Sequence, residues 1–259
     1  MIRPLGRQRV VIVVPCYNES NRLPVTLFED FLADPQCGCV FVDDGSTDGT
    51  LNVLDSIRAG REEHVSVVRC PSNRGKAEAV RYGIQHALEK DADFYGFWDA
   101  DLATPLGAVW DFCSVLEREP AVDMVFGSRV RLLGRHIERR ALRHYAGRAF
   151  ATVVSWVLRL PVYDTQCGAK IFRSRDLVGK LFERPFLSRW VFDVELIARY
   201  IQVTGSPQIA AKGIYECPLH EWTDVAGSRL KLSDFGVAFW DIVRIYRKYM
   251  RAAVTTKGT

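Results

Sequence analysis

The sequence lacks any hydrophobic run long enough to cross a membrane. Its longest uncharged stretch with a helical pattern is residues 149–158, which lie between Arg148 and Arg159. A membrane-spanning helix needs about 20 consecutive apolar residues. A secretory signal is lacking too, because the first apolar run, residues 10–14, is short and ends at Pro15. We therefore expect a cytoplasmic protein that is soluble or peripheral on the cytoplasmic face of a membrane.

Paired metal-binding cysteines are also absent. The chain has 7 cysteines but no C-x-x-C, and Cys37 and Cys39 are too close together for an ordinary structural zinc pair. Cys217 and His220 are three positions apart but lack a second pair. This usage is typical of reduced thiols in a cytosolic protein. We expect free cysteines.

A strong net charge is missing as well. The net charge is +4 over 259 residues, which is too small to indicate a nucleic-acid partner. The positive charge is unevenly placed, however, because residues 129–148 contain seven arginines and one acid, Glu138. With 48% hydrophobic residues, no repeat and no low-complexity linker, the chain is expected to form a single domain over residues 1–259.

The first half of the chain alternates strand-like and helix-like patterns. Strands are predicted at residues 10–14, 40–42, 65–68, 94–98 and 122–126, and helices at 23–32, 47–57, 76–88 and 106–116. Strands separated by helices indicate an α/β fold with a mostly parallel central sheet flanked by helices. Ligands of such sheets bind beyond the carboxyl ends of the strands.

The second half is less regular. We predict helices at residues 142–160, 192–203 and 235–250, a short strand at the end of 161–173, and a strand at 208–217. The last helix is basic and amphipathic.

Two acids two residues apart, Asp99 and Asp101, follow the predicted strand 94–98. In an extended segment such residues point the same way, so their carboxylates repel each other unless a cation lies between them. Hard divalent cations prefer carboxylate oxygens, and a cation held by one or two carboxylates keeps positions open for phosphate. The pair therefore indicates a nucleotide diphosphate ligand; the alternative is a solvated loop.

Polar residues also follow the other predicted strands. No G-x-G-x-x-G follows the first one, which argues against a Rossmann dinucleotide site. Instead, Tyr17 can stack on a base and Glu19 can accept from its N–H groups. The second strand ends at Asp43 and Asp44, one of which can bind a base or ribose. Ser46 or Thr47, which follow, can cap the next helix. These loops and the two acids are expected to converge on one sheet edge.

The turn at residues 73–76 opens a predicted helix. Its backbone N–H groups, together with Arg74 and Lys76, can form an anion site. Solvated cations on a loop are the alternative.

The chain resembles family-2 glycosyltransferases with the GT-A fold in five motifs that occur in the same order: V-V-P-C-Y-N-E, V-D-D-G-S-T-D-G-T, N-R-G-K-A-E-A-V-R-Y-G, W-D-A-D and G-S-R. Three later segments narrow the resemblance to the dolichyl-phosphate β-glucosyltransferase branch: Y-D-T-Q-C-G-A-K, R-W-V-F-D-V-E and E-W-T-D-V-A-G-S-R-L. Dolichyl-phosphate mannose synthases are slightly more distant. The resemblance covers about residues 10–248.

The resemblance implies a nucleotide-sugar half, residues 1–128, and an acceptor half, residues 129–250. Asp101, with Asp99, would bind Mg²⁺ or Mn²⁺ and the diphosphate, and Arg129 would neutralise phosphate. Mannose synthases carry a Gln where this chain has Ala103, so either the metal has fewer protein ligands here or Thr104 is a further one. The residues implied to hold the nucleotide sugar are Pro15, Tyr17, Glu19, Asp44, Arg74, Lys76, Asp99, Ala100, Asp101 and Arg129.

The transfer inverts an α-linked donor to a β product by in-line attack. A hydroxyl acceptor needs a general base, for which Asp193 is the first candidate and Glu195 the second. On a helix these two residues would not face the same way. A phosphate acceptor is already anionic and needs no base, so Asp193 would then orient the sugar or acceptor. A helix N-cap is the structural alternative for Asp193.

The arginine-rich segment suits a phosphate acceptor at a membrane surface. Arginines precede an amphipathic stretch that could lie in the lipid interface, and basic residues attract anionic lipids. The final helix is either a second membrane contact or packing. The residues predicted to bind the acceptor are Arg139, Arg140, Arg143, Lys170 and Trp190.

The sequence thus predicts a metal-dependent inverting enzyme that moves glucose from UDP-glucose to polyprenyl or dolichyl phosphate. Four alternatives stay open: a soluble small-molecule acceptor, a GDP-mannose donor, a sugar-phosphate nucleotidyltransferase, and an inactive subunit that only binds nucleotide sugar.

Overall fold

The first half of the chain alternates strands and helices, as predicted. The structure is a computed structural model that describes residues 9–138, 141–173, 175–224 and 232–251. The elements of the first half are β1 (Val10–Cys16), α1 (Val25–Leu32), β2 (Cys37–Asp43), α2 (Thr50–Arg58), β3 (Val65–Arg69), α3 (Lys76–Ala87), β4 (Phe94–Trp98), α4 (Ala108–Arg118) and β5 (Met124–Ser128).

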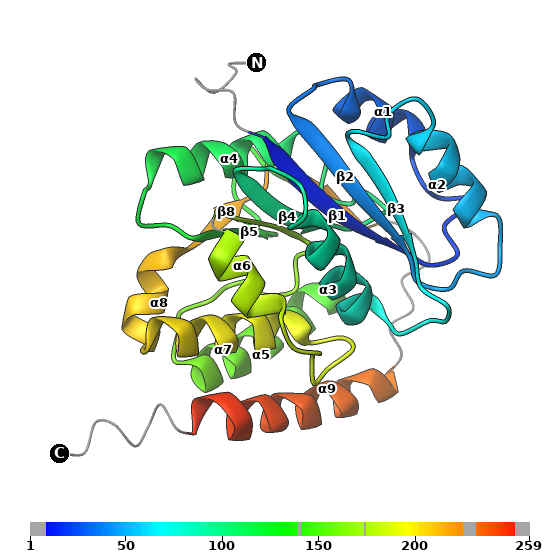
Figure 1. The fold of residues 1–259 in the computed structure, drawn as a ribbon. Helices are drawn as coiled ribbons and strands as arrows, with labels where there is room; N and C mark the ends of the chain where they lie inside the picture. Colours follow the sequence, from blue (N-terminus) through cyan, green and yellow to red (C-terminus); the bar gives the residue numbers. More distant parts are fainter. Residues whose placement is uncertain (1–8, 139–140, 174, 225–231, 252–259) are drawn as a thin grey trace.

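The second half adds further helices and the strands that complete the sheet (Figure 1). Its elements are β6 (His136–Glu138), α5 (Ala141–Leu158), β7 (Ala169–Phe172), α6 (Arg175–Phe182), α7 (Phe192–Thr204), α8 (Pro207–Gly213), β8 (Ile214–Pro218), β9 (Glu221–Thr223), α9 (Leu232–Ile245) and the π-helix η1 (Tyr246–Met250).

The central sheet has seven strands in the order β3-β2-β1-β4-β7-β5-β8. Strands β3, β2, β1 and β4 are parallel to one another, and β5 pairs with β8 in parallel. Strand β7 alone runs antiparallel, between β4 and β5. The predicted fold, a mostly parallel sheet flanked by helices, is therefore confirmed.

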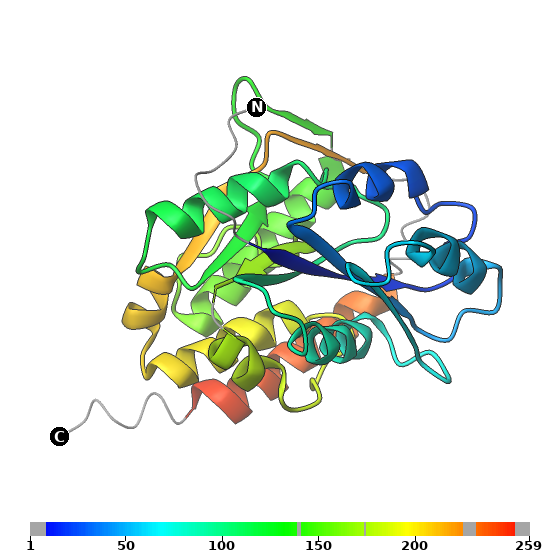
Figure 2. The same ribbon diagram turned by 45° about the horizontal axis from the view of Figure 1, so that its top comes forward.

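Helices cover both faces of the sheet (Figure 2). Alternate residues of β1 enter two separate cores: Val11 and Val13 pack with α3 and α7, whereas Ile12 and Val14 pack with α1, α2 and α4. A strand buried on both faces must be apolar at every position, which explains the unbroken run in β1. The seven cysteines are all free thiols, as expected. In the described part of the chain, no helix has both the length and the apolar character needed to span a membrane.

The predicted strand at residues 208–217 is wrong over most of its length. Helix α8 occupies Pro207–Gly213, and the strand β8 begins only at Ile214. Ser206 caps the helix by accepting the N–H of Ile209, and Pro207 takes the first helical position, where its missing N–H is harmless. Three elements were not predicted at all: α6, β6 and β9.

The loops that follow β1 and β2 are fastened to each other. The N–H of Asn18 donates to Ser46 Oγ at 3.0 Å, and the N–H of Thr47 donates to Asn18 Oδ1 at 2.9 Å. The predicted convergence of these two motifs on one sheet edge is confirmed.

Asp44 fastens the third loop. Its buried carboxylate accepts the backbone N–H groups of Arg74 and Gly75, each at 2.8 Å. Gly75 has φ +92°, which favours glycine, and α3 begins at the next residue. Asp44 therefore positions the start of α3 without any ligand.

The contact between α3 and the sheet can be tested at Gly83. A Cβ there would lie 2.2 Å from Val13 Cγ1 and 2.7 Å from Val42 Cγ2. We expect Gly83→Ala to lower the free energy of unfolding by about 1–3 kcal/mol through overpacking. Gly179→Ala in α6 is the control, because a Cβ there meets nothing within 4 Å, and it should be neutral or stabilising. Urea unfolding measures both, and equal effects would contradict the packing.

The structural role of Asp44 predicts a loss of stability in the ligand-free protein. Asp44→Ala leaves two backbone N–H groups without their acceptor and should cost about 1–3 kcal/mol. Asp44→Asn keeps one acceptor oxygen and should lose less. If Asp44 only contacted a bound nucleotide, urea unfolding without ligand would not distinguish either variant from the wild type.

Candidate active site

Asp99 and Asp101 lie directly beyond the carboxyl end of β4, as predicted. The N–H of Asp99 donates to the carbonyl of Gly168 at 2.9 Å, and Asp101 Oδ1 accepts the N–H of Ala103 at 3.1 Å. Leu102 has φ +48°, so the chain turns sharply after the second acid. Burial raises the pKa of the Asp101 carboxyl, and the neighbouring Asp99 adds to this effect.

Lys76, at the first position of α3, forms an ion pair with Asp99. Burial opposes the charged ammonium, but Asp99, Asp193 and Asp101 together raise the pKa of Lys76. The positive charge thus lies within reach of three carboxylates. The structure brings together the predicted anion-binding turn and the predicted metal ligands.

The oxygen atoms at this edge fit a hard cation that shares its ligands with phosphate. Asp99 and Asp101 supply carboxylate oxygens, which Mg²⁺ and Mn²⁺ prefer. Among the described residues, no group of three or more His, Cys, Asp and Glu side chains is arranged to hold a metal. Thr104, considered as a further ligand, is buried with its hydroxyl 3.8 Å from Cys167 Sγ. Two carboxylates suit a cation that a diphosphate helps to hold.

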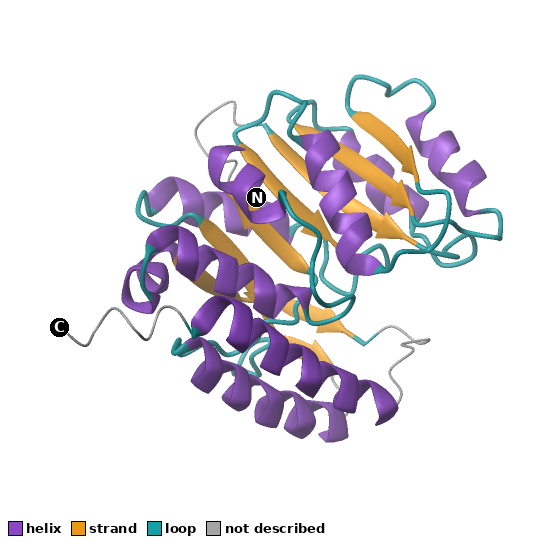
Figure 3. Ribbon diagram, turned by 60° about the horizontal axis from the view of Figure 1, so that its bottom comes forward, coloured by secondary structure: helices purple, strands orange, loops and turns teal. Residues whose placement is uncertain are grey.

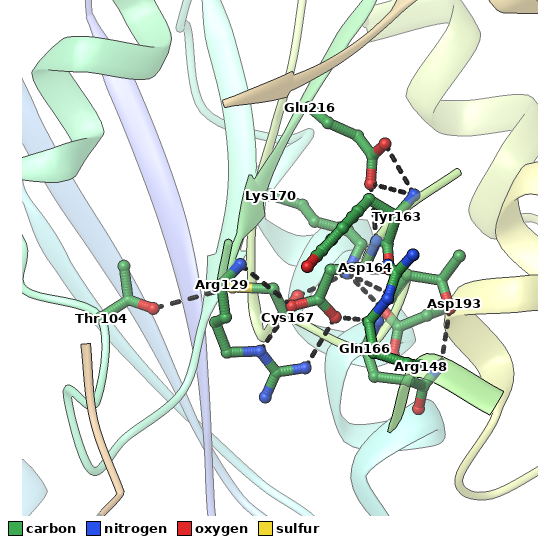
Figure 4. Close-up of polar contacts among 11 residues, drawn as sticks. Thr104, Arg129, Arg148, Tyr163, Asp164, Gln166, Cys167, Lys170, Asp193 and Glu216 are labelled. Atoms are coloured by element: carbon green, nitrogen blue, oxygen red, sulfur yellow. Dashed lines mark hydrogen bonds and ion pairs between the residues drawn. The ribbon is translucent and has the colours of Figure 1, made fainter. Parts of the chain in front are cut away.

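Asp193, the third carboxylate near Lys76, is paired with a buried lysine (Figure 4). Lys170 has an exposed fraction of 0%, and its Nζ lies 2.6 Å from Asp193 Oδ1. The same ammonium donates to the carbonyls of Thr165 and Cys167 at 3.1 and 2.5 Å. A buried charge is tolerated when it is paired and hydrogen-bonded in this way. Any contact between Lys170 and an acceptor would require the ammonium to leave these oxygens.

The environment of Asp193 suits a functional group better than a helix cap. Helix α7 begins at Phe192 and its N-cap position is Val191, so Asp193 lies inside the first turn. Burial raises the pKa of Asp193, while Lys170 and Lys76 oppose that shift.

Glu195, the second candidate base, faces a different part of the molecule. Its buried carboxylate accepts from the N–H of Leu187 at 2.6 Å, from Tyr249 Oη at 2.8 Å and from Arg199 at 2.7 Å. The structure therefore separates it from Asp193, as helical spacing implies.

Arg129 follows β5 and is held by Asp164. Its Nε and Nη2 donate to the two carboxylate oxygens at 2.6 and 2.7 Å, and its backbone N–H donates to Oδ2 at 3.1 Å. Burial opposes the charge, but Asp164 raises the pKa of Arg129. The guanidinium also lies over the ring of Trp222, 5.3 Å from its centroid. This bidentate pair fixes the orientation of Arg129.

Sequence reasoning missed the residues that hold this loop. Glu216 of β8 accepts the N–H groups of Tyr163 at 2.8 Å and Asp164 at 2.7 Å (Figure 4). Arg148 of α5 stacks on the ring of Tyr163, 3.7 Å from its centroid. A pocket of about 40 Å³ between α5 and residues 163–166 is lined by Arg148, Tyr163 and Arg129. The Y-D-T-Q-C-G motif identified the loop in the sequence, but it did not indicate that Glu216 and Arg148 hold it.

The other predicted donor residues lie around the same edge. Pro15 near the end of β1 and Tyr17 just after it are half-buried. Ala100 is buried between the two acids, and Glu19 pairs with Arg22 at 2.6 Å.

Two predicted residues lie at the margin of the site. The side chain of Arg74 extends along α3 and donates to Tyr82 Oη at 2.8 Å. Trp190 is 39% exposed and follows Arg189, which donates to Asn73 Oδ1 at 2.8 Å. Arg139, Arg140 and the side chain of Arg143 lie outside the described residues.

A larger cavity, of about 180 Å³, lies at the opposite, amino-terminal end of β1 and β2. None of the predicted site residues lines it. The polar cluster at the carboxyl edge is therefore the better candidate site, in agreement with the usual position of ligands in such sheets.

Known structures share this architecture. Glucosyl-3-phosphoglycerate synthase from Mycobacterium tuberculosis, in complex with Mn²⁺, UDP and phosphoglyceric acid, matches 92% of this chain and 77% of its own with a TM-score of 0.65 and 17% identity. A mannosyltransferase from Pyrobaculum calidifontis, in complex with GDP-Man and Mn²⁺, matches 97% of this chain and 66% of its own with a TM-score of 0.63 and 19% identity. These likenesses show the GT-A fold.

Sequence comparisons identify the family. The mouse dolichyl-phosphate beta-glucosyltransferase is 31% identical over 97% of this chain and 79% of its own length. The human protein of the same name is 30% identical over 95% of this chain and 77% of its own. The family model described as Glycosyl transferase family 2 matches residues 11–182. The chain is a hexosyltransferase and belongs to glycosyl transferase family 2.

Proposed function

We propose that this enzyme moves glucose from UDP-glucose to a polyprenyl phosphate such as dolichyl phosphate, with inversion and with the help of Mg²⁺ or Mn²⁺. The observation that carries the proposal is the ion pair between Lys76 and Asp99, with Asp101 and Asp193 within electrostatic reach of the same ammonium. The names of the relatives, at 30% and 31% identity, support glucose and dolichyl phosphate.

The donor would bind along the edge formed by the loops after β1, β2 and β4. Tyr17 offers a face for the base, and the N-terminal end of α3 offers N–H groups and Lys76 to the diphosphate. Asp99 and Asp101 would hold the divalent ion, whose chemistry is to neutralise charge on the leaving diphosphate. Arg129 would add a fixed positive charge that neutralises phosphate of the donor.

The chemistry follows from these placements. An oxygen of the acceptor phosphate attacks the anomeric carbon, the bond from that carbon to the UDP oxygen breaks, and UDP leaves with the electron pair. The α-linked glucose becomes β-linked. The attacking phosphate is already anionic, so Asp193 would orient the sugar rather than remove a proton. With a hydroxyl acceptor, Asp193 would be the base.

A lipid acceptor requires contact with a membrane, and α9 offers a suitable surface. Phe239 and Trp240 are 62% and 58% exposed, and Trp156 on α5 is 81% exposed. Helices α5 and α9 run side by side along the lower side of the molecule in Figure 1, and Figure 3 turns this side forward. Exposed basic residues follow on the same helical stretch: Arg244, Arg247 and Lys248. Exposed aromatics with basic neighbours favour a lipid interface.

The decisive experiment is transfer of radiolabelled glucose from UDP-glucose to a short-chain polyprenyl phosphate, with phosphoglyceric acid as the soluble competitor. We expect label in the lipid phosphate alone, loss of transfer with EDTA, and recovery with Mn²⁺. Transfer only to phosphoglyceric acid would reject the lipid phosphate and make a soluble small molecule the acceptor. Formation of UDP-glucose and pyrophosphate from glucose 1-phosphate and UTP would indicate the nucleotidyltransferase alternative.

The metal assignment predicts a large effect at Asp101. Asp101→Ala should lower turnover by about 100-fold or more, because it removes a ligand of the charge-stabilising ion. The control is Glu183→Ala. Glu183 is an exposed residue in the loop between α6 and α7, and its carboxylate lies 3.9 Å from Arg184. Near-normal turnover of Asp101→Ala with unchanged thermal unfolding would reject the metal role.

The membrane contact predicts a binding defect in an α9 variant. The double change Phe239→Ser and Trp240→Ser should weaken co-sedimentation with anionic vesicles about tenfold, because it removes the apolar anchor. Val203→Ser, at an exposed apolar position of α7, is the control. Salt should weaken the residual binding. Equal binding of both variants at matched thermal stability would exclude α9 as the contact.

A further inference from the structure

The ammonium of Lys76 lies among the carboxylates of the candidate site and is the positive charge nearest to Asp99 that an ion pair records. It contacts Asp99 directly, and Asp101 and Asp193 lie within electrostatic reach. The two side chains of this ion pair are 38% and 36% exposed, so solvent and ligands can reach them. In the protein without ligand, Lys76 thus balances the acids that are proposed to hold the metal.

The backbone holds Lys76 in this place. Asp44 accepts the N–H groups of the two preceding residues, and Arg189 donates to the carbonyl of Arg74 at 3.0 Å. A Cβ at Gly75 would lie 2.7 Å from Arg189 Nε, so the loop is packed on both sides. The backbone just before Lys76, the first residue of α3, is therefore held in place by these contacts, whereas the Lys76 side chain is partly exposed.

Asp99 is confined from the other side. Its N–H is bound by the carbonyl of Gly168, and a Cβ at Gly168 would lie 1.9 Å from Asp99 Oδ2. The carboxylate therefore has the Gly168 backbone on one side and the Lys76 ammonium on the other. A cation that binds Asp99 Oδ1 must compete with Lys76 for that oxygen.

We propose that Lys76 is a resident counter-cation that weakens metal binding until the donor diphosphate draws its ammonium away from Asp99. This inference rests on the proposed function, because it assumes that a metal and a diphosphate bind at this edge. The diphosphate accepts the ammonium, Asp99 is released to the metal, and the two ligands bind with positive coupling.

The charges at the site support this coupling. Asp99, Asp101 and Asp193 carry three negative charges, and Lys170 is enclosed by carbonyls and Asp193, so Lys76 is the accessible cation among these five groups. Repulsion between an ammonium and a divalent ion a few Å apart corresponds to about tenfold or more in affinity. Thermodynamic reciprocity then requires that the metal tighten nucleotide binding by the same factor.

The experiment is a titration of the purified protein with Mn²⁺, in which electron paramagnetic resonance measures free Mn²⁺, with and without UDP. For Lys76→Met without UDP we expect Mn²⁺ affinity about tenfold higher than in the wild type, and a smaller gain when UDP is added. Lys76→Arg keeps the charge and should retain weak binding. Lys180→Met, an exposed position on α6, controls for the change in net charge.

The outcomes separate this proposal from the proposed function. Unchanged or weaker Mn²⁺ binding in Lys76→Met, relative to Lys180→Met and at equal thermal stability, overturns the counter-cation role alone. If the wild-type protein does not bind Mn²⁺ even with UDP, the metal-dependent function fails and this proposal fails with it. Tighter Mn²⁺ binding in Lys76→Met together with a reduced effect of UDP supports the coupling.

Discussion

The insertion of β7, antiparallel between β4 and β5, is the constraint that joins the parts of the site. The loop before it holds Arg129 through Asp164, its Gly168 carbonyl binds the N–H of Asp99, and Lys170 on the strand itself pairs with Asp193. One short segment therefore sets the relative positions of groups from β4, β5 and α7. Without this segment, these groups would lose the contacts that fix their positions relative to one another.

Most charged groups near the site are already paired in the ligand-free protein. Arg129 is matched by Asp164, Lys170 by Asp193 and Lys76 by Asp99. Buried charges require such partners, since an isolated ion in a low-dielectric interior is costly. The pairs differ in exposure, however, because the Lys170 pair is closed off whereas the Lys76 pair is open to solvent. The two lysines of the site thus differ in access: Lys170 is closed off inside the protein, and Lys76 can be reached from solvent.

The sequence predicted the parallel half of the fold well, and it predicted that the candidate site residues meet at one edge of the sheet. Runs such as Val10–Cys16 are apolar at nearly every position because both faces are buried, and acids placed just after such runs must lie at the carboxyl edge. Predictions failed where local and tertiary signals differ. Apolar residues suggested a strand where Ser206 and Pro207 begin α8, and the burial of Lys170 depends on carbonyls and an acid that no local pattern reveals.

The bonds between the loops after β1 and β2 have a consequence for the way a donor is recognised. Asn18, Ser46 and Thr47 hold each other through side chain–backbone bonds that need no ligand. The entropy of ordering these loops is lost when the chain folds, so an incoming nucleotide meets a preorganised surface. Discrimination among bases would then come from rigid shape and hydrogen-bond complementarity, expressed mainly as differences in dissociation rate.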